Sequence, residues 1–363
     1  MPTGKSQDLL RLKKRNHIFN IIINNKDLSK LAIKKRCGYS MTSVISVVEE
    51  LTRENLITVQ DASAASVGRP PQKININPAG GYIIGIDFSR ENIFLSVFNI
   101  KRERMFSIDK KTEDINTTAE FIDRIAALIG EADIRAKELT DGAGLIGIGI
   151  GVPGYIDAAK GSVSGYDYIS DYRDAPVKDI LEKRFGAPVF LENNVNAMAL
   201  GYKWLKLGGK AKSLMVLTVR RGVKAALIVD NKLVKGASGY AGEIGKLTAE
   251  GNMTYEDILS DYTVVRKYSE INSADEIVTL ARQGDLKAID YLDKLSDCIT
   301  KLILPCAALI NPGEIVLVGA YAGSGYFVNL IKEKTALNIT GGNARELGPI
   351  GAAGLVIESV YGY

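Results

Sequence analysis

Two strand–turn–strand segments recur in the C-terminal three quarters of the chain, and this repeat limits the folds available to it. The first comprises residues 82–86 and 93–98, and the second comprises residues 214–218 and 225–229. Each strand is a short apolar run bounded by turn residues, which is the pattern of a buried strand. A glycine-rich run over residues 145–154 adds a further strand and turn. Each of the two segments is therefore expected to form two strands joined by a tight connection.

The N-terminal segment has the periodicity of three short helices. Apolar residues recur densely over residues 9–23, and Asp27 is a suitable N-cap for a second helix over residues 28–36. Gly38 ends this helix, and Ser40 caps a third one. The apolar residues of the third helix follow an i, i+3, i+4, i+7 pattern: Val44, Val47, Val48 and Leu51. The second and third helices are therefore joined by a short glycine-containing turn, as in a helix-turn-helix.

The outer face of the third helix begins with short, mostly polar side chains. These are Met41, Thr42, Ser43 and Ser46. In a helix-turn-helix, residues at the N-terminal end of the second helix of the motif meet base edges in the major groove, and the helix N-terminus favours a phosphate. An ordinary three-helix bundle with a polar outer face has the same pattern, so these residues alone do not decide between the two.

The residues that follow favour DNA binding. Residues 56–60 and 73–77 alternate like two strands, and residues 61–68 form a loop of small residues between them, which together predict a wing. Arg69 lies in a Gly-Arg-Pro-Pro sequence at the base of this wing. A cation held on such a stiff frame suits a narrow minor groove, although a plain linker could have the same sequence.

Positive charge is concentrated in the same part of the chain. Residues 1–80 hold 13 Lys and Arg against 6 Asp and Glu, whereas residues 81–363 hold 33 against 36. This distribution is expected if the N-terminal segment meets phosphate backbones, and a solvated basic face is the alternative.

Several classes of chemistry are excluded by composition. The only histidine is His17, so residues 18–363 have no imidazole for acid–base catalysis or metal binding. The three cysteines are scattered and form neither a disulfide framework nor a metal cluster: Cys37, Cys298 and Cys306. No apolar run approaches the roughly 18 residues that a membrane helix needs, and no signal peptide is evident, so a cytoplasmic location is expected.

Four motifs together resemble the ROK family (repressors, open reading frames and kinases). The Gly-Arg-Pro-Pro sequence at residues 68–71, after a winged helix, resembles that of the family's regulators. Three further segments match family motifs in order and in approximate spacing: Glu-Asn-Asn-Val-Asn-Ala at 192–197, Gly-Tyr-Ala-Gly-Glu-Ile-Gly-Lys at 239–246 and Glu-Asp-Ile-Leu-Ser at 256–260. The resemblance covers essentially the whole chain and is to the sugar-responsive regulators of this family.

This resemblance implies a specific architecture. A winged helix-turn-helix over residues 1–78 would precede a sugar-kinase-like domain over residues 81–363, giving an α/β protein overall. The second domain would have the actin-like ATPase (ribonuclease H-like) fold of two subdomains, one of about residues 81–190 plus the C-terminal helix and one of about residues 191–345. In that fold a nucleotide lies between the subdomains, and the two strand–turn–strand segments supply its phosphate loops.

Departures from the family pattern imply that phosphoryl transfer is lost. Asn194 stands where the kinases have the aspartate that acts as general base, and an amide has no basic lone pair at ordinary pH. Ser89 replaces a glycine of the first phosphate loop, and bulkier residues replace the Gly and Thr run of the second: Arg220, Arg221, Lys224 and Ala226. Such side chains obstruct the close approach of backbone N–H groups to phosphate, although the cations could themselves attract phosphate.

The zinc site of the family is also altered. Lys246 replaces its histidine, and residues 247–255 contain none of its three cysteines. Neither a metal nor a cofactor is therefore expected. No catalytic residue is assigned, and the chain is not expected to be an enzyme.

The resemblance implies a repressor of carbohydrate-metabolism genes that binds an operator in double-stranded DNA as a homodimer and responds to a sugar or sugar derivative. The residues expected to bind this effector are Asn193, Asn194, Glu243, Lys246 and Glu256. Lys246 could favour an acidic or phosphorylated sugar, or it could pair with Glu243 or Glu256 and close the site. Two alternatives remain open, namely a sugar kinase with an attached DNA-binding module and a regulator whose C-terminal domain is only a scaffold for dimerisation or protein binding.

Overall fold

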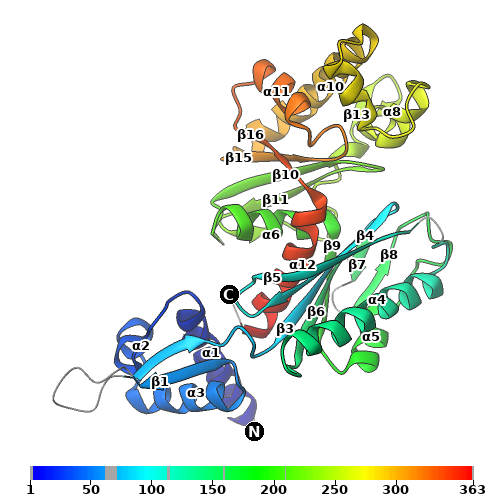
Figure 1. Cartoon of the computed structure of the whole chain (residues 1–363). Helices are drawn as coiled ribbons and strands as arrows, with labels where there is room; N and C mark the ends of the chain where they lie inside the picture. The colour runs from blue at the N-terminus through cyan, green and yellow to red at the C-terminus, as the bar shows by residue number, and fades with distance from the viewer. Residues whose placement is uncertain (1–2, 62–71, 113–114, 158–159, 209, 362–363) are drawn as a thin grey trace.

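A computed structural model describes residues 3–61, 72–112, 115–157, 160–208 and 210–361 of the chain (Figure 1). The N-terminal part consists of three helices and a two-stranded antiparallel sheet in which Ile57 pairs with Ile76. Its elements are α1 (Thr3–Ile23), α2 (Lys30–Cys37), α3 (Met41–Arg53), β1 (Ile57–Asp61) and β2 (Gln72–Ile76). The predicted helix-turn-helix and the two strands of the wing are thus present. Arg69 and most of the wing loop lie outside the described residues.

The prediction that Asp27 caps the second helix is wrong. Ser29 is the N-cap, and its side chain accepts a hydrogen bond from the Ala32 N–H group. Leu28 instead exchanges two backbone hydrogen bonds with Ile74 in β2, and Asp27 has a positive φ of 52°. This tertiary pairing holds the chain extended and delays the start of the helix by two residues. Gly38 ends the helix as predicted, in the left-handed region at φ 74°.

The first lobe, which contains β3 to β9 with α4 and α5, is a five-stranded sheet of order β5-β4-β3-β6-β9. Its main elements are β3 (Tyr82–Phe88), β4 (Asn92–Asn99), β5 (Arg104–Lys111), α4 (Thr118–Leu139), β6 (Leu145–Val152), α5 (Val177–Phe185) and β9 (Val189–Asn193). A small hairpin of β7 (Tyr155–Asp157) and β8 (Ser162–Ser164) follows β6.

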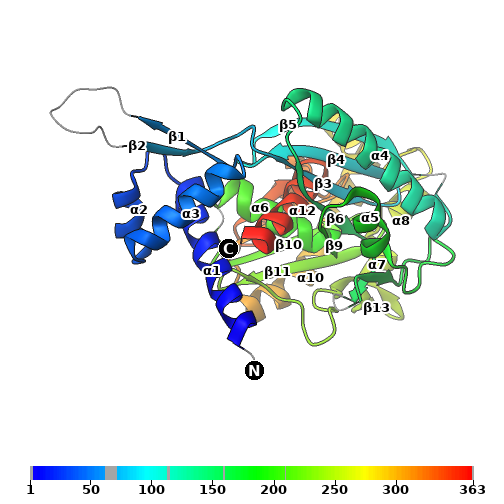
Figure 2. The same ribbon diagram turned by 90° about the horizontal axis from the view of Figure 1, so that it is seen from below.

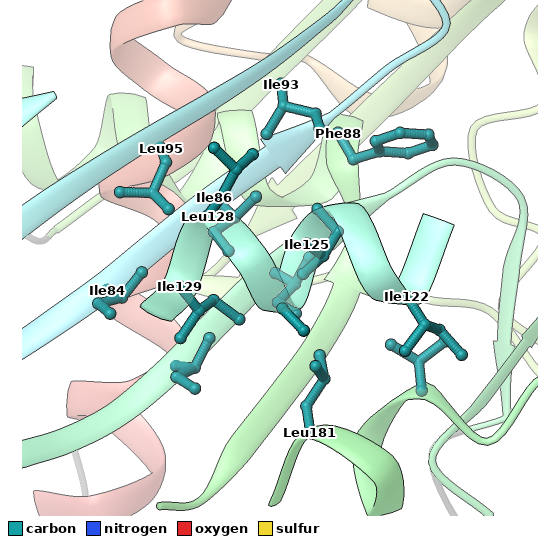
Figure 3. Packing of buried hydrophobic residues seen from close by; sticks show 14 of the residues in the cluster. Ile84, Ile86, Phe88, Ile93, Leu95, Ile122, Ile125, Leu128, Ile129 and Leu181 are labelled. Atoms are coloured by element: carbon teal, nitrogen blue, oxygen red, sulfur yellow. The ribbon is translucent and has the colours of Figure 1, made fainter. Parts of the chain in front are cut away.

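Strand β3 is buried on both faces, and this explains its continuous apolar sequence. Alternate residues, Ile84, Ile86 and Phe88, point toward α4 and pack on its apolar stripe, as Figure 3 shows. Ile83 belongs instead to the cluster that contains the C-terminal helix α12 (Ala344–Tyr361). The sheet therefore lies between α4 and α5 on one side and α12 on the other.

The second lobe, which contains α6 to β16, repeats this scheme with a sheet of order β12-β11-β10-β15-β16. In both sheets an antiparallel hairpin is extended by two parallel strands, as the repeated strand–turn–strand segments predicted. The strands are β10 (Ser213–Val219), β11 (Val223–Val229), β12 (Lys232–Leu233), β15 (Glu314–Val318) and β16 (Ile339–Gly342), with a separate pair, β13 (Thr248–Glu250) and β14 (Met253–Thr254). The helices are α6 (Asn194–Lys206), η1 (Ile244–Lys246), α7 (Tyr255–Leu259), α8 (Asp261–Lys267), α9 (Glu276–Arg282), α10 (Leu286–Ile310) and α11 (Gly325–Lys334).

Helices α6 and α12 pack against each other between the two sheets (Figure 1). Glycines permit this close approach, because a Cβ on Gly351 of α12 would lie 1.7 Å from the Ala197 carbonyl oxygen of α6. A Cβ on Gly149 of β6 would similarly lie 1.8 Å from the Ala352 carbonyl oxygen of α12. Helix α12 is thus fixed against both lobes.

The far end of α12 lies beside α1 of the winged helix, and both views of the molecule show this (Figures 1 and 2). The rings of Phe19 and Tyr361 stack with their centroids 4.2 Å apart. Asn20 Nδ2 donates a hydrogen bond to the Tyr361 carbonyl oxygen at 3.2 Å. Residues of the winged helix and of α12 therefore share one apolar cluster. None of the helices in the described residues is both long and apolar enough to cross a lipid bilayer.

Candidate effector pocket and DNA-binding helix

A cavity of about 380 Å³ lies between the two lobes. Its wall combines the segments that resemble the family's sugar motifs with the β3–β4 and β10–β11 turns. All five residues predicted to bind an effector line it, namely Asn193, Asn194, Glu243, Lys246 and Glu256. Segments separated by more than sixty residues in the sequence are thus brought to one pocket.

The two asparagines are held by the junction between β9 and α6. Asn193 is the N-cap of α6, and its Oδ1 accepts a hydrogen bond from the Val195 N–H group at 3.0 Å. Its Nδ2 donates to the Gly154 carbonyl oxygen at 3.0 Å. Asn194 Nδ2 donates to the Phe88 carbonyl oxygen at 3.3 Å, so this amide connects α6 to the end of β3. The N-terminal end of α6 therefore forms part of the pocket wall.

Glu243 and Lys246 belong to a group of charges around one tyrosine. Glu243 pairs with Lys224 at 2.8 Å and with Lys246 at 3.4 Å. Lys246 Nζ also donates to the Tyr155 hydroxyl at 2.8 Å, and this hydrogen bond, together with the charge of Glu243, raises the pKa of the lysine. Of the two pairings considered for Lys246, the one with Glu243 is present. Glu256 instead accepts a hydrogen bond from the Val223 N–H group at 3.0 Å.

Aromatic residues of the pocket were not predicted from the sequence. The ring of Tyr155, in the first lobe, lies 4.1 Å from that of Tyr240 in the second lobe. Lys224 and Lys246 lie over the same ring of Tyr155 at 5.9 Å and 5.5 Å. The position of Tyr155 directly after the glycine-rich strand and turn was a usable signal. Tyr166 and Tyr168, which also line the cavity, lie in a segment without a recognisable motif.

The β3–β4 and β10–β11 turns, which also line the cavity, contact each other. Arg220 Nη2, in the β10–β11 turn, donates to Ser89 Oγ, in the β3–β4 turn, at 2.7 Å. Arg221 Nε donates to Glu91 Oε1 at 3.0 Å. The side chains that depart from the family pattern thus bond to each other across the cleft.

Helix α3 presents its predicted DNA-binding residues at its N-terminal end. Ser40 is the N-cap and accepts a hydrogen bond from the Ser43 N–H group at 3.2 Å. Thr42 and Ser46 are exposed, while Met41 and Ser43 are half-buried. The buried residues of the helix are the four predicted from periodicity: Val44, Val47, Val48 and Leu51.

Basic residues beside this helix have two different roles. Arg11 and Arg15 of α1 form ion pairs with Glu50 of α3, so they link helices within the N-terminal part. Three exposed cations at the end of α2 precede the turn of the motif: Lys34, Lys35 and Arg36. The periodicity that located α2 did not single these residues out, although they stand next to the turn.

Within the described residues, no group of three or more His, Cys, Asp or Glu side chains is arranged to hold a metal ion. The expectations of no metal and no cofactor stay predictions.

The fold and the pocket define the class of this protein: a winged helix-turn-helix joined to a two-lobed sugar-kinase-type domain with a cavity between the lobes. The chain belongs to the ROK family, whose model matches residues 83–355. The resemblance and the fold class predicted from the sequence are both confirmed.

Several relatives extend over most of the chain. The "Xylose repressor" of Caldicellulosiruptor bescii is 32% identical in an alignment 347 positions long, which covers 87% of this chain and 84% of the relative. That of Bacillus spizizenii is 26% identical and covers 93% of both chains. The "Glucokinase" of Thermotoga maritima is 26% identical over 65% of this chain and 81% of its own.

Solved structures share the fold. A ROK family transcriptional regulator described as a homolog of the Escherichia coli MLC protein superposes with a TM-score of 0.82 at 17% identity, covering 97% of both chains. A ROK family glucokinase from Streptomyces griseus, in complex with glucose and AMPPNP, superposes with a TM-score of 0.65 at 23% identity over 76% of this chain and 99% of its own. The regulator therefore matches the N-terminal part as well, whereas the kinase matches only the two lobes.

Proposed function

We propose that this protein is a sugar-responsive, DNA-binding repressor of carbohydrate-metabolism genes that acts in the cytoplasm. The observation that carries this proposal is the combination, in one chain, of an exposed helix-turn-helix and a cleft lined by all five predicted effector residues. The relatives that match most of the chain are named xylose repressors. We assign the DNA-binding domain to residues 1–78 and the effector domain to residues 81–363, with its subdomains at about 81–190 plus the C-terminal helix and about 191–345.

DNA binding would follow the usual geometry of a helix-turn-helix dimer. Two copies of α3, one from each protomer of a homodimer, would enter successive major grooves of the operator. Met41, Thr42, Ser43 and Ser46 would meet base edges there, while Arg69 would enter the adjacent minor groove. The exposed cations at the end of α2 would add phosphate contacts that do not depend on sequence.

A double substitution, Thr42→Ala with Ser46→Ala, is expected to weaken operator binding by about tenfold or more. The reason is that a hydrogen bond contributes about 0.5–1.5 kcal/mol, so the loss of two hydroxyl contacts amounts to about 1–3 kcal/mol. Gel-shift titration on an operator selected from random DNA by the native protein measures this. Thr52→Ala, at the opposite end of α3, is the matched control and should bind like the native protein. Equal weakening by both variants would contradict the assignment of this face.

The effector that we propose is a neutral monosaccharide, with a pentose as the first candidate because the relatives are named for xylose. The cavity, at about 380 Å³, is of the size that small ligands occupy. Asn193, Asn194 and Glu256 offer polar groups for hydroxyls, and Tyr155 offers an aromatic face. Since Lys246 and Lys224 both contact Glu243, much of their charge is already balanced within the protein.

A thermal-shift screen of neutral sugars, sugar acids and sugar phosphates is expected to give a neutral-sugar hit. A ligand at 100 times its Kd stabilises the folded state by about 2.7 kcal/mol, so the melting temperature should rise clearly. Calorimetry should then give the same affinity for the native protein and for Lys246→Ala, with Lys301→Ala as a control at an exposed site. A response confined to charged sugars, and lost in Lys246→Ala, would show instead that the lysine recognises an anion.

Catalysis is not part of the proposal, because Asn194 cannot accept the proton of a sugar hydroxyl as an aspartate would. The kinase alternative is tested by a coupled ATPase assay with the same sugars, in which turnover would establish an enzyme. The scaffold alternative is tested by the thermal-shift screen, since a domain without an effector site would respond to none of the sugars.

A further inference from the structure

The two arginines of the β10–β11 turn connect the two lobes across the cleft. Arg220 and Arg221 belong to the second lobe, while their partners Ser89 and Glu91 belong to the first. The hydrogen bond to Ser89 is 2.7 Å long and the one to Glu91 is 3.0 Å long. These contacts join two turns that are far apart in the sequence and lie on different sheets.

Arg220 also lies near two carboxyl groups, one from each lobe. Its Nη1 is 3.8 Å from Oδ2 of Asp87, a fully buried residue of β3. Asp261 of α8 belongs to the second lobe, and its N–H group donates to the Arg220 carbonyl oxygen at 2.9 Å. Burial raises the pKa of Asp87 and of Asp261 to about 7, and Arg220 is the main influence that opposes this rise. Removal of the arginine would thus affect both lobes at once.

Arg221 is placed between aromatic rings of both lobes. Its guanidinium carbon lies 5.9 Å from the ring centroid of Tyr168 in the first lobe and 5.2 Å from that of Tyr262 in the second. Arginine stacks favourably on such rings because its planar cation is weakly hydrated. Its ion pair with Glu91 adds a second contact across the cleft, beside the one to Tyr168.

We propose that Arg220 and Arg221 form a clasp that holds the two lobes together without a nucleotide. The turns that carry the clasp correspond, by the family resemblance, to the two phosphate loops of the kinases. In the kinases, a phosphate group bound by backbone N–H groups would connect these two turns. Here arginine–carboxylate pairs connect them. The lobes are consequently held closed by the chain itself, and only the sugar end of the cavity remains to respond to a ligand. The clasp itself does not depend on the proposed function. Only the effect of lobe closure on operator binding rests on that function.

The clasp also has a physical connection to the DNA-binding part. Asp87 packs against α12, since a Cβ on Gly348 would lie 2.5 Å from Asp87 Cβ. The other end of α12 carries Tyr361, which stacks on Phe19 of the winged helix. Opening of the cleft would therefore take Arg220 away from a carboxyl group that packs directly against this helix.

Hydrogen exchange and small-angle scattering of the full chain test the clasp. In Arg220→Ala with Arg221→Ala, we expect the amides of residues 88–93 and 219–224 to exchange about tenfold faster, a factor that corresponds to about 1.4 kcal/mol. The radius of gyration should increase as the lobes separate. The matched control is Lys301→Ala with Lys332→Ala, which removes two exposed charges from the same lobe and should change neither quantity. Glu91→Gln weakens the clasp from the opposite side and should give a smaller change in the same direction, even if the double arginine variant does not fold.

Two results would overturn the proposal. The first is unchanged exchange and scattering in both the arginine variant and Glu91→Gln. The second is binding of Mg-ATP to the native protein with slower exchange in the two turns, because the arginines would then be phosphate ligands. A sugar screen without any hit would change neither of these results. Failure of the effector hypothesis can therefore be distinguished from failure of the clasp.

Discussion

Replacing Tyr361 with alanine is expected to destabilise the junction between the winged helix and α12 by about 3 kcal/mol and to disconnect effector binding from operator release. The side chain is 2% exposed, and its ring stacks on Phe19 at 4.2 Å. Truncation of a buried aromatic residue to alanine typically costs about 3–5 kcal/mol, and the lower end applies here because one side of the site is a boundary between two parts of the chain.

The route from the pocket explains why this residue should matter for regulation. Helix α6 begins at Asn194 in the pocket wall and packs along α12 through Gly351. Helix α12 then ends at Tyr361 on the winged helix. A ligand can shift the DNA-binding part only if it favours one arrangement of these helices over another. Tyr361 is the last large contact in this series.

Urea unfolding and gel shifts, with and without the sugar found by screening, measure the two expected effects. Tyr361→Phe keeps the ring and is the matched control, so it should resemble the native protein in both assays. If Tyr361→Ala has native stability, or releases its operator at native sugar concentrations, α12 does not transmit the effector signal through this contact.

The second large effect is expected from Gly351→Ala, which should lower stability by about 3 kcal/mol or more. The added Cβ would lie 1.7 Å from the Ala197 carbonyl oxygen and 2.7 Å from the Gly201 nitrogen, and both are backbone atoms that cannot rotate away. Helices α6 and α12 would have to separate, and overpacking of this kind is among the few causes of large losses. For a domain of this size, the melting temperature should fall by roughly 5 °C or more.

Gly130→Ala is the matched control for this prediction. Gly130 lies within α4, and a Cβ there would meet no atom within 4 Å. Alanine in a helix interior is favoured over glycine by about 0.5–1 kcal/mol, so the control should be slightly more stable than the native protein. Thermal unfolding of both variants is sufficient. A similar melting temperature for the two would mean that α6 and α12 can move apart at little cost.

Local sequence patterns predicted the N-terminal part well because its signals are short in range. The spacing of Val44, Val47, Val48 and Leu51 identifies the buried face of α3, and Ser40 caps that helix in the structure. Asp27 failed as a predicted cap because a pairing between Leu28 and Ile74, which are far apart in the sequence, holds the backbone extended. No property of Asp27 itself could have indicated this.

The predicted effector residues meet in one cavity, but their bonding could not be derived from their identities. The sequence allowed Lys246 to pair with Glu243 or with Glu256. The short helix η1 places Lys246 near Tyr155 and Glu243, so the pairing with Glu243 is the one that forms. Tyr240 reaches Tyr155 only because the two lobes approach each other. These contacts depend on the relative position of the lobes, which no local pattern encodes.

The sequence by itself determined the two hairpins, the helix-turn-helix and the family, because each depends on residue types at short spacing. Only the tertiary structure decided that Arg220 crosses the cleft to Ser89 and that α12 ends against Phe19. Such contacts join residues separated by more than one hundred positions. They exist because close packing of the two sheets, α6 and α12 brings these side chains together, and packing of that kind is a property of the whole chain.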